Sequence, residues 1–238
     1  MAIKNTAALV KGLVLSISFL VVLALIFSPI FGDGYNGLEY SDNMFNKLSK
    51  GSSYFIPAVQ KNAAKFAGQE ASFSIKMAKP EENAIAQKIL TFAGAQVKEA
   101  EGSLKVIGDL GKIFSAALAD ADAGYKNDAA LFSTQYGLDA QVALNAWWNI
   151  LKGMDKGLKK DKKFKEASMA VSVQKKGIEA AHNYYGIEAI KVADKAGIMS
   201  GLLVFYVVYT VWWGFAIFYL FEAIGFVMKK KAKVKKAA

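Results

Sequence analysis

The sequence predicts an all-α membrane protein in which two transmembrane helices flank an antiparallel, four-helix-bundle-like exported domain. Two apolar segments indicate the membrane class: residues 12–31 contain no charged side chain, and residues 199–228 contain only Glu222. A helix needs about 20 apolar residues to cross the hydrocarbon core of a bilayer. Between the two segments, apolar residues recur at intervals of three and four, which is the period of a helix with one buried face.

Composition excludes several kinds of chemistry. The 238 residues include no cysteine and a single histidine, and all 30 basic residues are lysine. Without cysteine there are no disulfides, thiolate nucleophiles or iron–sulfur clusters, and without arginine no bidentate recognition of phosphate or carboxylate. The sequence contains no recognisable set of nucleophile, base and oxyanion donors. We therefore expect a protein that is not an enzyme and holds no cofactor.

The first apolar segment, residues 12–31, is predicted to be an uncleaved signal anchor that follows a cytoplasmic N-terminus, residues 1–11. The alternative is a cleaved signal peptide. Its apolar region would be shorter, about 7–15 residues, and a small-residue cleavage site would follow it. The small residues that follow here, Ser28, Gly32 and Gly34, do not form such a site.

Lysines outside the apolar segments predict the topology. Lys4 and Lys11 precede the first segment, and a lysine-rich tail, residues 229–238, follows the second, residues 199–228. Because cytoplasmic flanks are enriched in lysine, both termini are expected in the cytoplasm. Residues 32–198 are then periplasmic, and the protein is located in a bacterial inner membrane. The basic tails reflect topology, so nucleic acid is not an expected partner.

The exported region is expected to be entirely helical. A glycine-rich loop, residues 32–43, breaks the first helix, and a short helical turn near 42–50 follows it. Pro57 begins a helix that extends to about residue 79, and Pro80 begins a second that extends to about residue 119, since proline suits the first helical turn.

Two further helices complete the predicted bundle. The polar run 119–128 is expected to be a turn, and the third helix is expected over 128–160. The fourth begins near Lys162 and continues into the second transmembrane segment. Four long helices joined by short turns form an up-down-up-down bundle.

The densest cluster of charge in the exported region is the run 152–165. It could dock on an anionic periplasmic partner, and the alternative is an ordinary solvated turn. The lysines assigned to this partner-binding surface are Lys156, Lys159, Lys160, Lys162 and Lys163.

Acidic residues at alternating positions resemble an oxygen-ligand calcium loop. Asp120, Asp122 and Asp128 are the candidate ligands. The pattern departs from the EF-hand loop, because Tyr125 occupies the place of the turn glycine and Leu131 that of the bidentate glutamate. Acidic turns and helix caps are the alternative interpretation.

Aromatic residues are the other candidates for partner binding. Trp147 and Trp148 are adjacent, so on a helix they point about 100° apart. Either both pack in the core, or one, with Trp147 as the candidate, anchors an interface. In the second apolar segment, buried hydroxyl and indole groups need partners in lipid, which favours packing against the first segment or another subunit. The candidates there are Tyr209, Trp212, Trp213 and Tyr219.

The order of short tail, span, helical domain and return span resembles the sensing half of bacterial chemoreceptors. No motif carries this resemblance, and no receptor signalling region follows Met228, so we do not assign the chain to that family. The leading hypothesis is a non-enzymatic structural or accessory subunit of an inner-membrane assembly, in contact with lipid and with other membrane subunits or further copies of itself. The alternative is an extracytoplasmic ligand-sensing module that signals through a partner protein.

Overall fold

The computed structural model describes residues 3–100 and 102–226, and the chain forms two compact units. Unit 1 comprises residues 1–45 and 190–238, and unit 2 comprises residues 46–189. The lysine-rich tail at 229–238 lies outside the described residues. Within them the chain is mostly helical, as the sequence predicts, but unit 2 also contains a small sheet.

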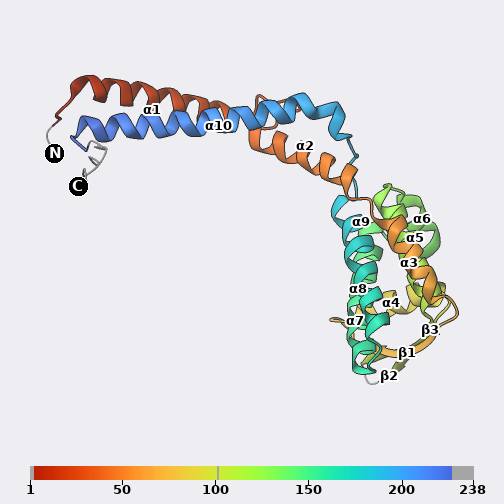
Figure 1. Ribbon diagram of the computed structural model, residues 1–238. Coiled ribbons are helices and arrows are strands. Elements are labelled where there is room, and N and C mark those ends of the chain that lie inside the picture. The colour runs from red at the N-terminus through yellow and green to blue at the C-terminus, as the bar shows by residue number, and fades with distance from the viewer. Residues whose placement is uncertain (1–2, 101, 227–238) are drawn as a thin grey trace, which may run out of the picture. The chain divides into compact units, whose positions relative to one another are not determined.

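Unit 1 contains two helices that are long and apolar enough to cross a membrane, α1 (Thr6–Ile26) and α10 (Val192–Ala223). They lie side by side (Figure 1). Small residues form the contact: Ala8 and Ala216 are buried, and a Cβ atom on Gly12 would lie 2.9 Å from the side chain of Leu220. At one end, the backbone N–H of Lys4 donates a hydrogen bond of 2.8 Å to the carbonyl of Ala223. The two helices therefore form a closely packed hairpin.

The predicted break after the first apolar helix is present, and it ends sooner than expected. Helix α2 spans Gly37–Ser52. Asn36 caps its first turn, since its Oδ1 accepts hydrogen bonds of 3.0 Å from the N–H groups of Leu38 and Glu39. Glu39 accepts a bond from the Asn36 N–H in return. This reciprocal capping box explains why the helix begins inside the predicted loop.

The prediction of an all-helical exported region is wrong over three segments, which form strands. These are β1 (Glu70–Ile75), β2 (Gln96–Ala100) and β3 (Ser103–Asp109), in the order β1-β3-β2 with both pairings antiparallel. Along β1, buried and exposed residues alternate, and Phe73 pairs with Val106 of β3 on the buried face. Alternation with a period of two is the signature of a half-buried strand.

Two glycines explain why the predicted helix over 80–119 is interrupted. Helix α4 (Pro80–Phe92) begins at proline as expected and ends before Gly94, which has φ 84°. Gly102 has φ 72° and lies in the turn between β2 and β3. Glycine adopts this left-handed region without the steric cost that other residues incur. The helical pattern resumes only in α5 (Leu110–Tyr125), which Asp109 caps.

The helix predicted from Pro57 is also shorter than expected. Helix α3 spans Ile56–Ala63, and a single 3₁₀ turn over Ala64–Phe66 ends it. The third predicted helix, residues 128–160, consists of α6 (Ala129–Tyr136) and α7 (Ala140–Lys160). Gly137, with φ 60°, separates α6 from α7.

The fourth predicted helix does not continue into the second apolar segment. It consists of α8 (Phe164–Val173), a π-helical turn (Gln174–Ile178) and α9 (Glu179–Tyr184). Irregular chain follows, with Gly186 at φ 79°, before α10 begins at Val192. Two of the four predicted long helices contain strands and the fourth ends before α10, so the predicted four-helix bundle is not confirmed.

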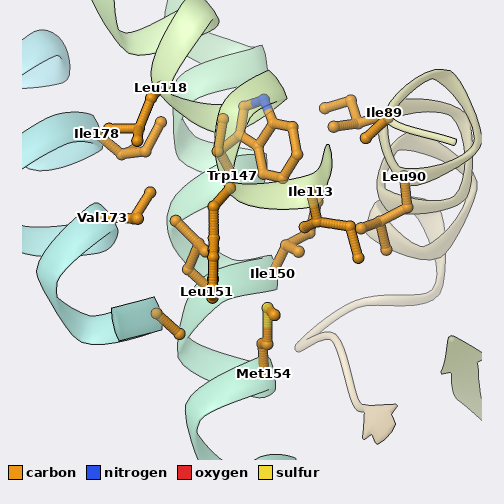
Figure 2. Close-up of a cluster of buried hydrophobic side chains, with 14 of the residues drawn as sticks. Ile89, Leu90, Ile113, Leu118, Trp147, Ile150, Leu151, Met154, Val173 and Ile178 are labelled. Atoms are coloured by element: carbon orange, nitrogen blue, oxygen red, sulfur yellow. The ribbon is translucent and has the colours of Figure 1, made fainter. Parts of the chain in front are cut away.

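The core of unit 2 lies where α5, α7, α8 and α4 meet. Figure 2 shows the indole of Trp147 among Leu118, Ile113 and Ile150, with Leu90 reaching in from α4. Trp147 and Ile150 are fully buried, and so are Phe73 and Val106 on the inner face of the sheet. Helix α7 therefore packs against both the other helices and the sheet.

Candidate functional site

The lysine run around the end of α7 divides into two groups in the structure. Lys159 forms an ion pair of 2.8 Å with Asp155 one turn earlier. Lys160 lies in the last turn of α7, where a cation interacts favourably with the helix dipole. Lys162 and Lys163 form the turn to α8, and Lys162 has φ 60°. Lys156 belongs to the second group, which lines a cavity between α7 and β1.

The three aspartates considered as calcium ligands are not brought together into one ligand set. Asp120 is 1% exposed and accepts hydrogen bonds from Trp147 Nε1 at 2.6 Å and Tyr136 Oη at 2.8 Å. Asp122 pairs with Lys126 at 2.6 Å, and Asp128 caps α6 through the Leu131 N–H. No group of three His, Cys, Asp or Glu suited to a metal ion occurs among residues 3–100 and 102–226.

Burial changes the electrostatics of Asp120. Loss of hydration raises the pKa of its carboxyl group, and the hydrogen bonds from Trp147 and Tyr136 only partly oppose this rise. The same site raises the pKa of Tyr136 well above its ordinary value, because the phenolate would be buried beside a carboxylate. Asp120 is therefore a buried acceptor in the core and is not available to a solvent ion.

The two adjacent tryptophans have different surroundings. Trp147, the candidate interface anchor for which core packing was the alternative, is fully buried in the core of unit 2. Trp148 is partly exposed, and the ammonium group of Lys175 lies 4.5 Å from the centroid of its ring system. Of the two, Trp148 is the one that can contact a ligand or a partner.

A groove beside Trp148 was not predicted from the sequence. It has a volume of about 320 Å³ and lies between α7 and the segment 175–183. Asn145 and Trp148 line one wall, and Lys175, Glu179, His182 and Asn183 line the other. The second wall begins in the π-helical turn, a distortion that is often found at functional sites. The isolated residue types gave no signal, because the groove is formed by residues from two separate parts of the chain.

The aromatic candidates of α10 pack mainly against α1. The ring of Phe19 stacks on Tyr209 with centroids 4.1 Å apart, and it lies 4.5 Å from the ring of Trp213. Lys11 lies over the ring of Tyr219 at 5.5 Å. The sequence leaves two packing partners open, the first apolar segment and another subunit. The rings of Tyr209 and Trp213 pack against the first of these, through Phe19.

Trp212 and Tyr219 also line an open apolar groove along α10. The groove has a volume of about 530 Å³ and includes Leu15 of α1 together with Val211 and Phe215. The Nε1–H of Trp212 is buried and has no hydrogen-bond acceptor among the described residues. A donor in that state costs free energy in an apolar environment.

Lys50 is another buried charged residue of unit 2 and was not identified from the sequence. It is 3% exposed, and its Nζ donates to the carbonyls of Ile187 at 2.5 Å and Tyr184 at 3.1 Å and to Oδ1 of Asn127 at 3.2 Å. Asn127 Nδ2 donates to the Ile187 carbonyl as well. Burial lowers the pKa of the Lys50 ammonium group, and Glu188 partly opposes that shift. Lys50 therefore joins both chain segments that leave unit 2, residues 46–52 and 185–189.

No known family model matches this chain, and neither does a curated protein or a solved structure. The functional argument therefore rests on the residues themselves.

Proposed function

We propose that this protein is a non-enzymatic accessory subunit of an inner-membrane assembly. In this proposal α1 and α10 cross the membrane as a hairpin, and unit 2 contacts a periplasmic partner. The observation that carries it is the groove along α10, where Trp212 lines an apolar surface while its Nε1–H lacks an acceptor within the described chain. A transmembrane helix of another subunit seated in this groove would cover the apolar surface.

The exposed apolar side chains of the hairpin support a place in the bilayer. Only small residues are buried between the helices, whereas Val204, Tyr206 and Phe215 are each more than half exposed. In water such a surface would cause aggregation, and in lipid it is the ordinary outer surface of a spanning helix.

The turn between α7 and α8 supports a partner contact by unit 2. Lys160, Lys162 and Lys163 are at the surface and form no ion pair in the described chain, so they offer positive charge to an anionic protein or polymer surface. The non-enzymatic role is supported by the commitment of Asp120 to the core, where a substrate cannot reach its carboxylate.

The topology is tested by labelling single cysteines, because the native chain contains none. In the variant Ser168→Cys the new thiol lies on the exposed surface of α8, and in Ala232→Cys it lies in the lysine-rich tail. A membrane-impermeant maleimide should label Ser168→Cys in intact spheroplasts and Ala232→Cys only after permeabilisation. Labelling of both, or the reverse order, contradicts two cytoplasmic termini.

The subunit role is tested by extracting the chain from its native membrane in mild detergent and weighing the particle. A particle containing other chains in fixed stoichiometry supports the proposal. The variant Trp212→Leu should release those chains, whereas Phe218→Leu, an exposed aromatic position outside the groove lining, should retain them. A lone chain of 25.8 kDa would contradict the proposal.

The groove beside Trp148 favours a second candidate function, a ligand-sensing module. An indole, two carboxamides, an imidazole and a Lys175–Glu179 ion pair of 2.9 Å surround a cavity open to solvent, a combination suited to a polar organic molecule. Native mass spectrometry of the purified chain tests it. A retained small molecule that is lost in Asn145→Leu would favour the sensor, and an empty chain would count against it.

A further inference from the structure

A cavity between the end of β1 and the middle of α7 brings together three lysine side chains. Its volume is about 510 Å³. Lys76 lines it from the chain that follows β1, and Lys152 and Lys156 line it from α7. Ser74, Met77 and Asn149 also line the cavity, together with Ala78 and Gly153. No acidic residue is among the described residues that line it.

Close packing fixes the backbone of α7 against β1 beside this cavity. A Cβ atom on Gly153 would lie 2.9 Å from Cβ of Ile75, and one on Gly157 would lie 3.0 Å from the carbonyl oxygen of Ser74. Only glycine permits α7 to approach β1 this closely. Asn149, Lys152 and Lys156 share one face of α7, since they follow the spacing of three and four residues. The cavity is thus formed by α7, the end of β1 and the chain that follows β1.

The positive charge in the cavity is not neutralised by the described part of the chain. Asp155, which lies between Lys152 and Lys156 on α7, pairs with Lys159. Glu82, near Ala78 of the cavity lining, accepts a hydrogen bond of 3.3 Å from the Ala78 N–H. None of the described ion pairs includes Lys76, Lys152 or Lys156. Lysines four residues apart on a helix repel each other. A bound anion would relieve that repulsion.

We propose that this cavity binds a small organic ligand through a phosphate group. Three ammonium groups, the Ser74 hydroxyl and the Asn149 amide offer more positive charge and more donors than a single carboxylate can use. A phosphate dianion offers several acceptor oxygens, and lysine binds it as a point charge without the arginine fork. The remaining volume and the thioether of Met77 leave room for the organic part of the ligand.

This site is distinct from the partner surface at the α7–α8 turn. Either proposal can therefore be contradicted without affecting the other. Two sources share the chemistry: a soluble phosphate monoester and the headgroup of a lipid with a terminal phosphate. Glycerol 3-phosphate represents the first source and short-chain, soluble dihexanoyl phosphatidic acid the second.

The test is calorimetric titration of the full chain in an uncharged detergent at physiological salt. We expect saturable binding of at least one of the two probes with one site per chain. Lys152→Gln/Lys156→Gln should raise the Kd at least about tenfold, because two charge-assisted contacts are lost. The matched pair Lys61→Gln/Lys165→Gln removes the same charge from exposed positions outside the cavity and should leave the Kd within about twofold.

A substitution that leaves the net charge unchanged distinguishes a specific binding site from non-specific electrostatic attraction. Asn149→Leu keeps the net charge and the branched shape of the side chain but removes the amide donor, so it should weaken binding several-fold. Equal weakening by both lysine pairs together with no effect of Asn149→Leu would overturn the proposal. So would the absence of saturable heat with both probes. Binding of only one probe would assign the source of the phosphate group.

Discussion

The indole Nε1–H of Trp147 donates a hydrogen bond of 2.6 Å to Oδ2 of Asp120, and both side chains lie in the core of unit 2. Tyr136 donates to the same oxygen at 2.8 Å. Asp120 and Trp147, considered as a candidate calcium ligand and a candidate interface anchor, thus form a hydrogen bond with each other inside the fold.

Removing the acceptor at Asp120 should destabilise unit 2. Asp120→Leu leaves the Trp147 and Tyr136 donors buried without an acceptor, and we expect the free energy of unfolding to fall by about 2–4 kcal/mol. Asp120→Asn keeps an acceptor oxygen and should cost less. Chemical denaturation of the full chain in detergent, followed by tryptophan fluorescence, measures both. An equal loss in the two variants would show that the hydrogen bonds are not the cause.

The same carboxyl group predicts a pH dependence of stability. Burial raises the pKa of Asp120 above the ordinary value of 3.8, so the folded state holds a proton that the unfolded state has released. The contribution of Asp120 is most favourable at acidic pH and declines as pH rises from about 3.8 through the raised pKa. As pH rises from 4, the denaturation midpoint of the wild type should therefore fall relative to that of Asp120→Asn, whose side chain does not titrate. Parallel curves would contradict this.

Calcium should not bind to the 120–128 segment. Asp120 is buried, Asp122 pairs with Lys126, and Asp128 caps α6, so the three carboxylates cannot converge without breaking these contacts. Titration with millimolar calcium should give no saturable heat and no change in melting temperature. Saturable binding that is lost in Asp122→Asn would show that the segment can rearrange.

Lys50 should hold the chain segment 185–189 against unit 2. In Lys50→Met the carbonyls of Tyr184 and Ile187 lose a charged donor, so amide hydrogen exchange of this segment should become at least about tenfold faster. Lys47→Met is the matched control on the same helix, since none of the ion pairs in the described part of the chain includes Lys47. If exchange became equally faster in both variants, the hydrogen bonds of Lys50 would not be the cause.

The hairpin of α1 and α10 should depend on Gly12. A Cβ atom there meets the Leu220 side chain at 2.9 Å and its backbone nitrogen at 3.0 Å, so Gly12→Ala must push the helices apart. Gly201→Ala on α10 meets no atom within 4 Å and serves as the control. We expect only Gly12→Ala to lower the melting temperature of the protein in detergent. Equal melting temperatures for the two variants would show that this contact does not stabilise the hairpin.

How far the sequence could predict the candidate sites differs from residue to residue. Lys152 and Lys156 were visible within a lysine-rich run, but Lys76 is far from them in sequence and joins them only because α7 packs on β1. The sequence did not indicate the contacts of Lys50 and Asn127, because their partners are mainly backbone carbonyls. Every residue has a backbone carbonyl, so the residue types do not show which one is the acceptor. Phe19 was not proposed as the partner of Tyr209, although packing between the two apolar segments was expected.

The sequence by itself determined the two apolar helices and the starts of several others, because these depend on local properties. An uninterrupted apolar segment forms a helix over its own length, and Pro57 and Pro80 mark helix starts through backbone angles within one turn. Tertiary structure alone decided the sheet, since β1 is completed by hydrogen bonds to residues 104–109, and a segment with weak periodicity can become a strand only when that partner is present. It also decided the burial of Asp120 and Lys50 and the convergence of three lysines, because each depends on groups brought together from distant parts of the chain.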